Sequence, residues 1–176
     1  MTGKTDIEKE FGVDLDSKNL EIIKGIEAGI RIEEKNSLFY SHMTEALHNH
    51  ELIHFFRFLS EEKDLQKKIL EKVKKSLEEK DEWIKLEYDY GDLDDAFQKA
   101  ESLREKKLRM DAGDVDIITN AMKNEEKARF FYEKFAGVLR GEGNDFFRIL
   151  SEREERHHDL LSEMLDMVKH SSEESE

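Results

Sequence analysis

The chain has 176 residues, of which 41% are charged, and its formal net charge is −14. This length suits one domain with a single core, and the acidic balance leaves no basic surface for nucleic acid. Because cysteine is absent, disulfides, thiolate metal sites and iron–sulfur clusters are excluded.

The composition favours long helices. There is no proline, glycine is scarce, and Glu, Lys, Leu and Ile dominate. No apolar run approaches the ~20 residues of a membrane span. The first residues are too acidic and polar for a signal peptide. We therefore expect an all-α protein in the cytoplasm, with no membrane partner.

Four segments in chain order have helical periodicity, at residues 17–48, 51–80, 113–139 and 144–169. A polar extension (1–16) precedes them, and we expect the tail (171–176) to be disordered. A long crossover (81–112) separates the second and third segments and contains a predicted short helix at 95–110. Gly141 and Gly143 separate the third segment from the fourth, and Asn144 is the expected N-cap of the fourth.

The helices form an internal repeat. FFRFLSEEKDLQKKIL at 55–70 has the same frame as FFRILSEREERHHDLL at 146–161, and the Glu-Glu-Lys of 33–35 recurs at 125–127. The chain therefore consists of two copies of a helix pair, at about 17–80 and 113–170. A helix pair cannot bury its apolar stripe alone, so the two copies are predicted to close into a four-helix bundle spanning 17–170.

The last helix contains two overlapping Glu-x-x-His pairs. Glu154 and His157 fall on the same helical line as Phe147, Leu150 and Leu161, which predicts that this pair faces the core. The rival pair, Glu155 and His158, falls on a polar line and is predicted to be exposed.

Each remaining helix also has a polar residue on its inward line. Glu33 and Glu125 are each followed seven residues later by a tyrosine, Tyr40 and Tyr132. In the second helix, Lys63 and Gln66 occupy the positions that correspond to Glu154 and His157. A buried carboxylate must be paired, protonated or bound to a metal, so this cluster requires an explanation.

These residues resemble those of the rubrerythrin and ferritin-like di-iron carboxylate family, in which two helices each supply a Glu and the other two each supply a Glu-x-x-His. The resemblance covers about residues 17–170 and implies a ferritin-like four-helix bundle. It also implies that the two tyrosines, Tyr40 and Tyr132, hydrogen-bond across the site, and that the irons react with peroxide or oxygen. Only four of the six expected ligands are present, and the cysteine-rich rubredoxin tail is missing: Glu33, Glu125, Glu154 and His157 remain.

The charge of the cluster fits one divalent ion rather than two. Three glutamates and one lysine leave about two negative charges when the histidine is neutral. We therefore expect a half-preserved site for one Fe, or else Mn or Zn, with Glu125, Glu154 and His157 as ligands and Glu33 as a fourth ligand or nearby base. The resemblance implies a non-haem iron oxidoreductase with an external electron donor, in a homodimer.

Other interpretations remain open. Lys63 could pair with Glu33 or Glu154 while a protonated His157 pairs with Glu125, leaving a metal-free bundle that serves as an interaction or dimerisation module. Iron handling or storage is a third possibility. Four histidines cluster near the turn between the first two helices: His42, His48, His50 and His54. They could bind a metal at the surface, although histidines in such positions are more often solvated.

Overall fold

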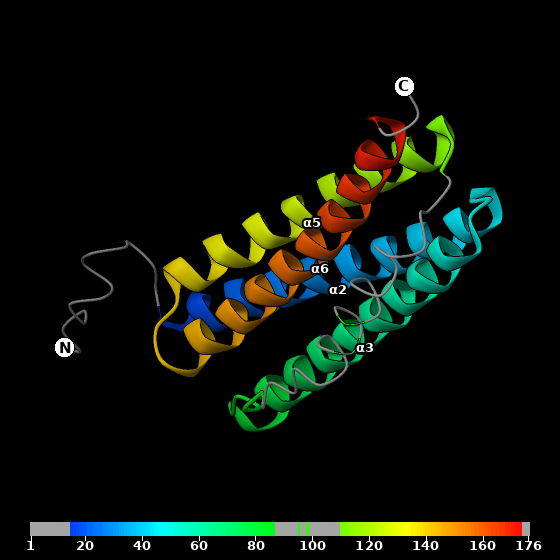
Figure 1. Ribbon diagram of the computed structural model, residues 1–176. Coiled ribbons are helices and arrows are strands. Elements are labelled where there is room, and N and C mark those ends of the chain that lie inside the picture. Colours follow the sequence, from blue (N-terminus) through cyan, green and yellow to red (C-terminus); the bar gives the residue numbers. More distant parts are fainter. Residues whose placement is uncertain (1–14, 87–94, 96–97, 99–109, 174–176) are drawn as a thin grey trace, which may run out of the picture.

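The fold is a bundle of four long helices, seen in a computed structural model that describes residues 15–86, 95, 98 and 110–173 (Figure 1). Within these residues the chain forms no strand, and the all-α prediction is confirmed. The predicted polar extension and the short helix at 95–110 lie largely outside the described residues. The last helix continues to Glu173, so the prediction of disorder is wrong for residues 171–173, while 174–176 lie outside the described residues. The helices are α2 (Leu15–Ala46), α3 (His50–Lys80), α5 (Ala112–Val138) and α6 (Glu142–Glu173).

Two helical hairpins make up the bundle. The most extensive contacts join α2 to α3 and α5 to α6, and α2 also contacts α5 (Figure 1). These hairpins correspond to the two copies of the sequence repeat. Equivalent residues of the repeat can therefore meet at the centre of the bundle, across the interface between the hairpins.

The outer faces of the helices carry the charge. Ion pairs join neighbouring turns, as in Arg148 with Glu152, or cross between helices, as in Lys74 with Glu27. Such exposed pairs contribute little to stability individually, but they keep the outer faces hydrated. None of the described helices combines the length and apolar content needed to cross a bilayer.

Side-chain caps fix the starts of two helices. Asn49 caps α3 by accepting hydrogen bonds from the backbone N–H groups of Glu51 and Leu52. Asp111 caps α5 in a reciprocal capping box with Asp114. Each cap satisfies N–H groups that have no partner within the helix.

The turn between α5 and α6 differs from the prediction in one detail. Gly141 has a positive φ of 62°, as the glycine-rich sequence indicates. However, α6 begins at Glu142, so the prediction that Asn144 caps it is wrong. The Asn144 amide instead donates to the carbonyl of Ala136, 2.7 Å away, which also accepts from the backbone N–H of Leu139.

The hydrophobic core is divided into two clusters of buried residues. The first includes Phe56 and Leu160, and the second includes Leu70 and Phe147. Apart from Asp114 at the start of α5, the buried polar residues of every helix lie between the residues of these two clusters. The two clusters therefore enclose a polar centre, which is shielded from water at both ends.

Gly25 on α2 is required by the close approach of α5. A Cβ added at this buried position would lie 1.9 Å from the Phe135 ring. We expect Gly25→Ala to lower the free energy of unfolding by about 1–3 kcal/mol, because the ring must move within a packed core. Urea denaturation followed by circular dichroism measures the loss.

Gly137 provides the matched control, since a Cβ there meets nothing within 4 Å. Gly137→Ala should leave stability unchanged or raise it by up to about 1 kcal/mol, through lower chain entropy in the unfolded state. Equal effects of the two substitutions would contradict the packing explanation for Gly25.

Candidate metal centre

The polar centre of the bundle collects the predicted site residues from all four helices. Helix α2 contributes Glu33 and α5 contributes Glu125, while α3 and α6 each contribute two residues. The side chains are completely buried, which confirms the inward orientation inferred from periodicity: Glu33, Lys63, Gln66, Glu125, Glu154 and His157. Tyr40 and Tyr132 are also completely buried.

The Lys63 ammonium is the hub of this centre. Its Nζ donates to Glu154 Oε2 and, at 2.7 Å, to Glu125 Oε2. It also lies 3.3 Å from His157 Nδ1 and 3.7 Å from Glu33 Oε2. All four predicted metal ligands therefore converge on one cationic atom of the protein itself.

The remaining carboxylate oxygens are held by neutral donors. The Gln66 amide donates to Glu154 Oε1 over 2.7 Å. Tyr40 donates to Glu125, and Tyr132 donates to Glu33. Each tyrosine reaches from one hairpin to the glutamate of the other, so the predicted bonds across the site are present. Both bonds orient a carboxylate while leaving its second oxygen turned toward Lys63.

A second buried ion pair lies behind the histidine. Arg153 Nη2 is 3.0 Å from Glu62 Oε2, and this same oxygen is 3.8 Å from His157 Nε2. His157 Nε2 makes no hydrogen bond among the described residues, because 3.8 Å is too long for one. Its Nδ1 lies 3.3 Å from Lys63 Nζ and 3.4 Å from Glu125 Oε2, so Nδ1 is the ring nitrogen that faces the glutamates.

Sequence reasoning missed Glu62 and Arg153, although the repeat contains a signal for them. The two pairs Glu62-Lys63 and Arg153-Glu154 occupy equivalent positions of the two copies, with the signs of charge exchanged. Each residue contacts its equivalent in the other copy: Lys63 meets Glu154, and Glu62 meets Arg153. The exchange of sign makes the two hairpins electrostatically complementary at their interface.

Electrostatics in the centre favour a charged Lys63 beside an ionised Glu125. Burial alone would lower the pKa of Lys63, but Glu125, Glu154 and Glu33 outweigh it and raise the pKa. Burial likewise opposes ionisation of Glu125, yet the nearby ammonium holds the pKa of this carboxyl well below its usual range. The two residues therefore form a charged pair.

The pKa values of the other two glutamates, Glu154 and Glu33, are raised instead. Burial raises the pKa of Glu154 far above its usual range and also raises that of Glu33, despite the opposing effect of Lys63. Burial and the adjacent carboxylates raise the pKa of both Tyr40 and Tyr132, which stay neutral donors. One ammonium does not fully neutralise three carboxylates, and protons complete the balance.

The donor set fits one metal ion but not two. Glu125, Glu154 and His157 offer three ligand atoms within 4.8 Å of one another, the oxygen–nitrogen combination that suits Fe, Mn or Zn. On α3, the positions equivalent to Glu154 and His157 hold Lys63 and Gln66. An ammonium has no lone pair, and an amide oxygen is a weak ligand for these metals.

The other possible metal ligands considered from the sequence lie at or near the surface. Glu155 is exposed and His158 is partly exposed, as predicted. His42 is exposed, and the rings of His50 and His54 stack with their centroids 5.3 Å apart. Among the described residues, the groups of three or more possible metal ligands include none of these side chains.

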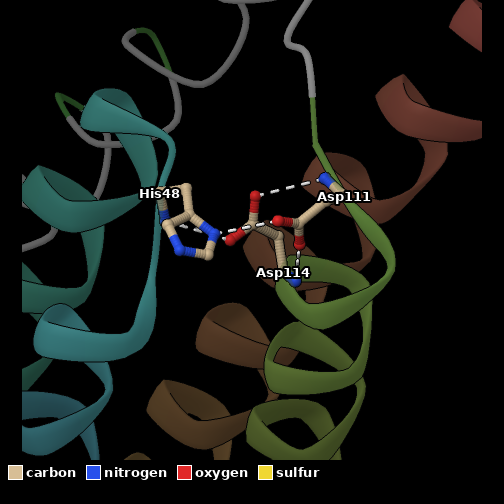
Figure 2. A group of neighbouring side chains, drawn as sticks. All are labelled: His48, Asp111 and Asp114. Atoms are coloured by element: carbon tan, nitrogen blue, oxygen red, sulfur yellow. Dashed lines mark hydrogen bonds and ion pairs between the residues drawn. The ribbon is translucent and has the colours of Figure 1, made fainter.

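A second group of possible ligands joins the turn after α2 to the start of α5 (Figure 2). His48 Nδ1 lies 2.8 Å from Asp111 Oδ2, and the His48 backbone N–H donates to Asp114. Both aspartates also accept backbone hydrogen bonds in the capping box of α5. These contacts give the carboxylates a structural role in connecting the two hairpins.

Comparison with known proteins gives a match over the second helix pair. No curated protein and no solved structure matches the chain significantly. Residues 116–176 match the family model described as Rubrerythrin. This match spans most of α5 and all of α6, the helices that supply Glu125, Glu154 and His157. It confirms the resemblance to the rubrerythrin and ferritin-like family for the second helix pair, and the four-helix fold is consistent with it.

Proposed function

We propose that this protein binds a single divalent transition-metal ion through Glu125, Glu154 and His157. The observation that carries the proposal is the convergence of two carboxylates and one imidazole, all completely buried, with ligand atoms within 4.8 Å of one another. The rubrerythrin match over the helices that bear these residues supports the same conclusion.

The charge of the centre supports one ion rather than two. Its three glutamates carry three negative charges when ionised, and the Lys63 ammonium offsets one of them. One divalent ion offsets the remaining two and would displace the protons held by the cluster. A second divalent ion would leave excess positive charge in a buried site, which is costly.

Iron is the ion that gives this site a reaction. When bound, iron supplies redox chemistry toward peroxide or oxygen, with electrons from a separate donor protein or small molecule. The residues of the chain hold and shield such an ion. Tyr40 orients Glu125, Gln66 orients Glu154, and the two hydrophobic clusters exclude water. Mn or Zn would fit the same ligands without requiring this reaction.

A second candidate function follows from the contacts of Lys63. The ammonium already pairs with Glu125 and Glu154, so the bundle can exist with its polar centre neutralised internally. In that case the protein is a metal-free ferritin-like bundle that acts as an interaction or dimerisation module. The buried ion pairs would then specify how the two hairpins pack.

Metal analysis distinguishes these functions. The full chain is expressed in medium supplemented with iron, and bound metal is measured by mass spectrometry. We expect close to one ion per chain, abolished by Glu154→Ala and unchanged by Glu155→Ala, which alters the exposed neighbour. Glu154 supplies a ligand atom, whereas Glu155 faces solvent.

Two other results would favour different conclusions. No metal in the wild type, with metal regained in Lys63→Glu/Gln66→His, would indicate a degenerate site that has lost binding. Two ions per chain in the wild type would show that Lys63 leaves the centre entirely, and would contradict the charge argument.

A further inference from the structure

Glu33 differs from the other two glutamates in its relation to the cluster. One of its oxygens accepts from Tyr132, and the other, Oε2, has no hydrogen-bond partner among the described residues. The nearest cation to Oε2 is the Lys63 ammonium, at 3.7 Å. The group of possible metal ligands contains Glu125, Glu154 and His157 but does not contain Glu33.

From this geometry we infer that the loaded centre holds two cations of different kinds, one metal ion and the Lys63 ammonium, with Glu33 as the partner of the ammonium rather than a metal ligand. The inference rests on the proposed function. It assigns Lys63 to the role of a permanent second cation, supplied by α3 in place of a second metal.

Three features of the centre support this division. Lys63 reaches Glu33, Glu125 and Glu154 from one position, so it can release the latter two to a metal while keeping Glu33. The Glu33 oxygen that faces it is unsatisfied and buried, and an unpaired carboxylate oxygen in this environment favours a close cation. The total charge of three carboxylates, one ammonium and one divalent ion is zero.

The two possible roles of Glu33 predict different dependence of its effect on metal binding on the presence of Lys63. If Glu33 neutralises Lys63, losing the carboxylate matters only while the ammonium is present, because an excess positive charge then lies beside the metal. If Glu33 is itself a metal ligand, its loss weakens binding whether or not Lys63 is present. A double-mutant cycle separates these cases.

The experiment measures Zn²⁺ affinity by isothermal titration calorimetry on the full chain after removal of metal with a chelator. The proteins are the wild type, Glu33→Gln, Lys63→Gln and the double variant, each checked for helical content by circular dichroism. Glutamine is used at residue 63 because its amide can still donate to the glutamates. Glu34→Gln, which alters the exposed neighbour that pairs with Lys67, is the control and should not change affinity.

We expect Glu33→Gln to weaken Zn²⁺ binding by roughly tenfold or more with Lys63 present and by less than about threefold in the Lys63→Gln background. Binding of one ion by the wild type with equal losses in both backgrounds would overturn the inference and make Glu33 a ligand. No loss in either background would also overturn it. Absence of binding by the wild type would instead remove the proposed function and the inference together.

Discussion

Lys63→Met will lower the free energy of unfolding of the metal-free protein by about 3–5 kcal/mol near neutral pH, the usual cost of removing one partner from a buried ion pair. The ammonium is completely buried and contacts carboxylates from three other helices. Without it, Glu33, Glu125 and Glu154 face one another with no cation between them. Glu33 and Glu154 already hold protons there, so Glu125 must either stay charged without a cation or take up a proton as well.

Lys67→Met is the matched control for this experiment. Lys67 lies one turn further along α3 and also pairs with a glutamate of α2, since its Nζ is 2.7 Å from Glu34 Oε1. That pair is partly exposed to solvent, so its loss should change stability little. The comparison isolates burial, because the helix and the type of substitution are the same.

A second variant tests the reason for the loss. Adding Glu125→Gln to Lys63→Met removes the carboxylate that the ammonium kept ionised and should restore part of the lost stability. Urea denaturation in the presence of a chelator measures all four proteins. If Lys63→Met costs no more than Lys67→Met, the ammonium is not the cation that neutralises the centre, and the charge argument for a single metal ion fails with it.

The fold and the membership of the polar centre could be predicted from sequence because both depend on periodicity. Helical spacing alone indicated that Glu154 and His157 face inward while Glu155 does not, and the internal repeat then identified Lys63 as the equivalent of Glu154. A residue on the inward line of a long helix has no alternative but burial, so these predictions did not depend on details of packing.

Contacts between helices were harder to predict from the sequence. Whether Lys63 pairs with one glutamate or several depends on how its long side chain crosses the bundle, which no periodic pattern specifies. Arg153 and Glu62 each lie beside an inward position, so the pattern predicted neither their burial nor their pairing. Asn144 was misread as a cap for a similar reason, since its partner Ala136 belongs to the preceding helix.

The stability of the metal-free protein should be greatest at acidic pH and should fall as the pH rises toward neutral. Glu33 and Glu154 have pKa values raised above the value of 4.5 that they have when unfolded. Above pH 4.5 the unfolded chain releases these protons while the folded chain retains them. Stability is therefore lost as the pH rises through the folded-state pKa values, by about 1.4 kcal/mol per pH unit for each proton retained.

Glu125 has the opposite effect on stability, and this effect operates below pH 4.5. Its folded-state pKa is lowered from 4.5, mainly because Lys63 outweighs the effect of burial. Its contribution to stability is present above pH 4.5 and is lost as the pH falls through the lowered value. The two effects together give a maximum of stability near pH 4.5, which urea denaturation at a series of pH values can locate. The fluorescence of Trp83, the single tryptophan, packed against Phe146 and Phe147, reports unfolding.

The net negative charge of the whole chain also destabilises the folded state as the pH rises, so controls must separate the two contributions. Glu33→Gln/Glu154→Gln should flatten the decline above pH 4.5, whereas Glu155→Gln, at an exposed position, should retain it. Saturating Zn²⁺ should reverse the slope in the wild type, since a metal ion binds ligands that have lost their protons. A wild-type profile that stays level above pH 4.5 without metal would mean that the centre holds no excess protons, and that a divalent ion has no protons there to displace.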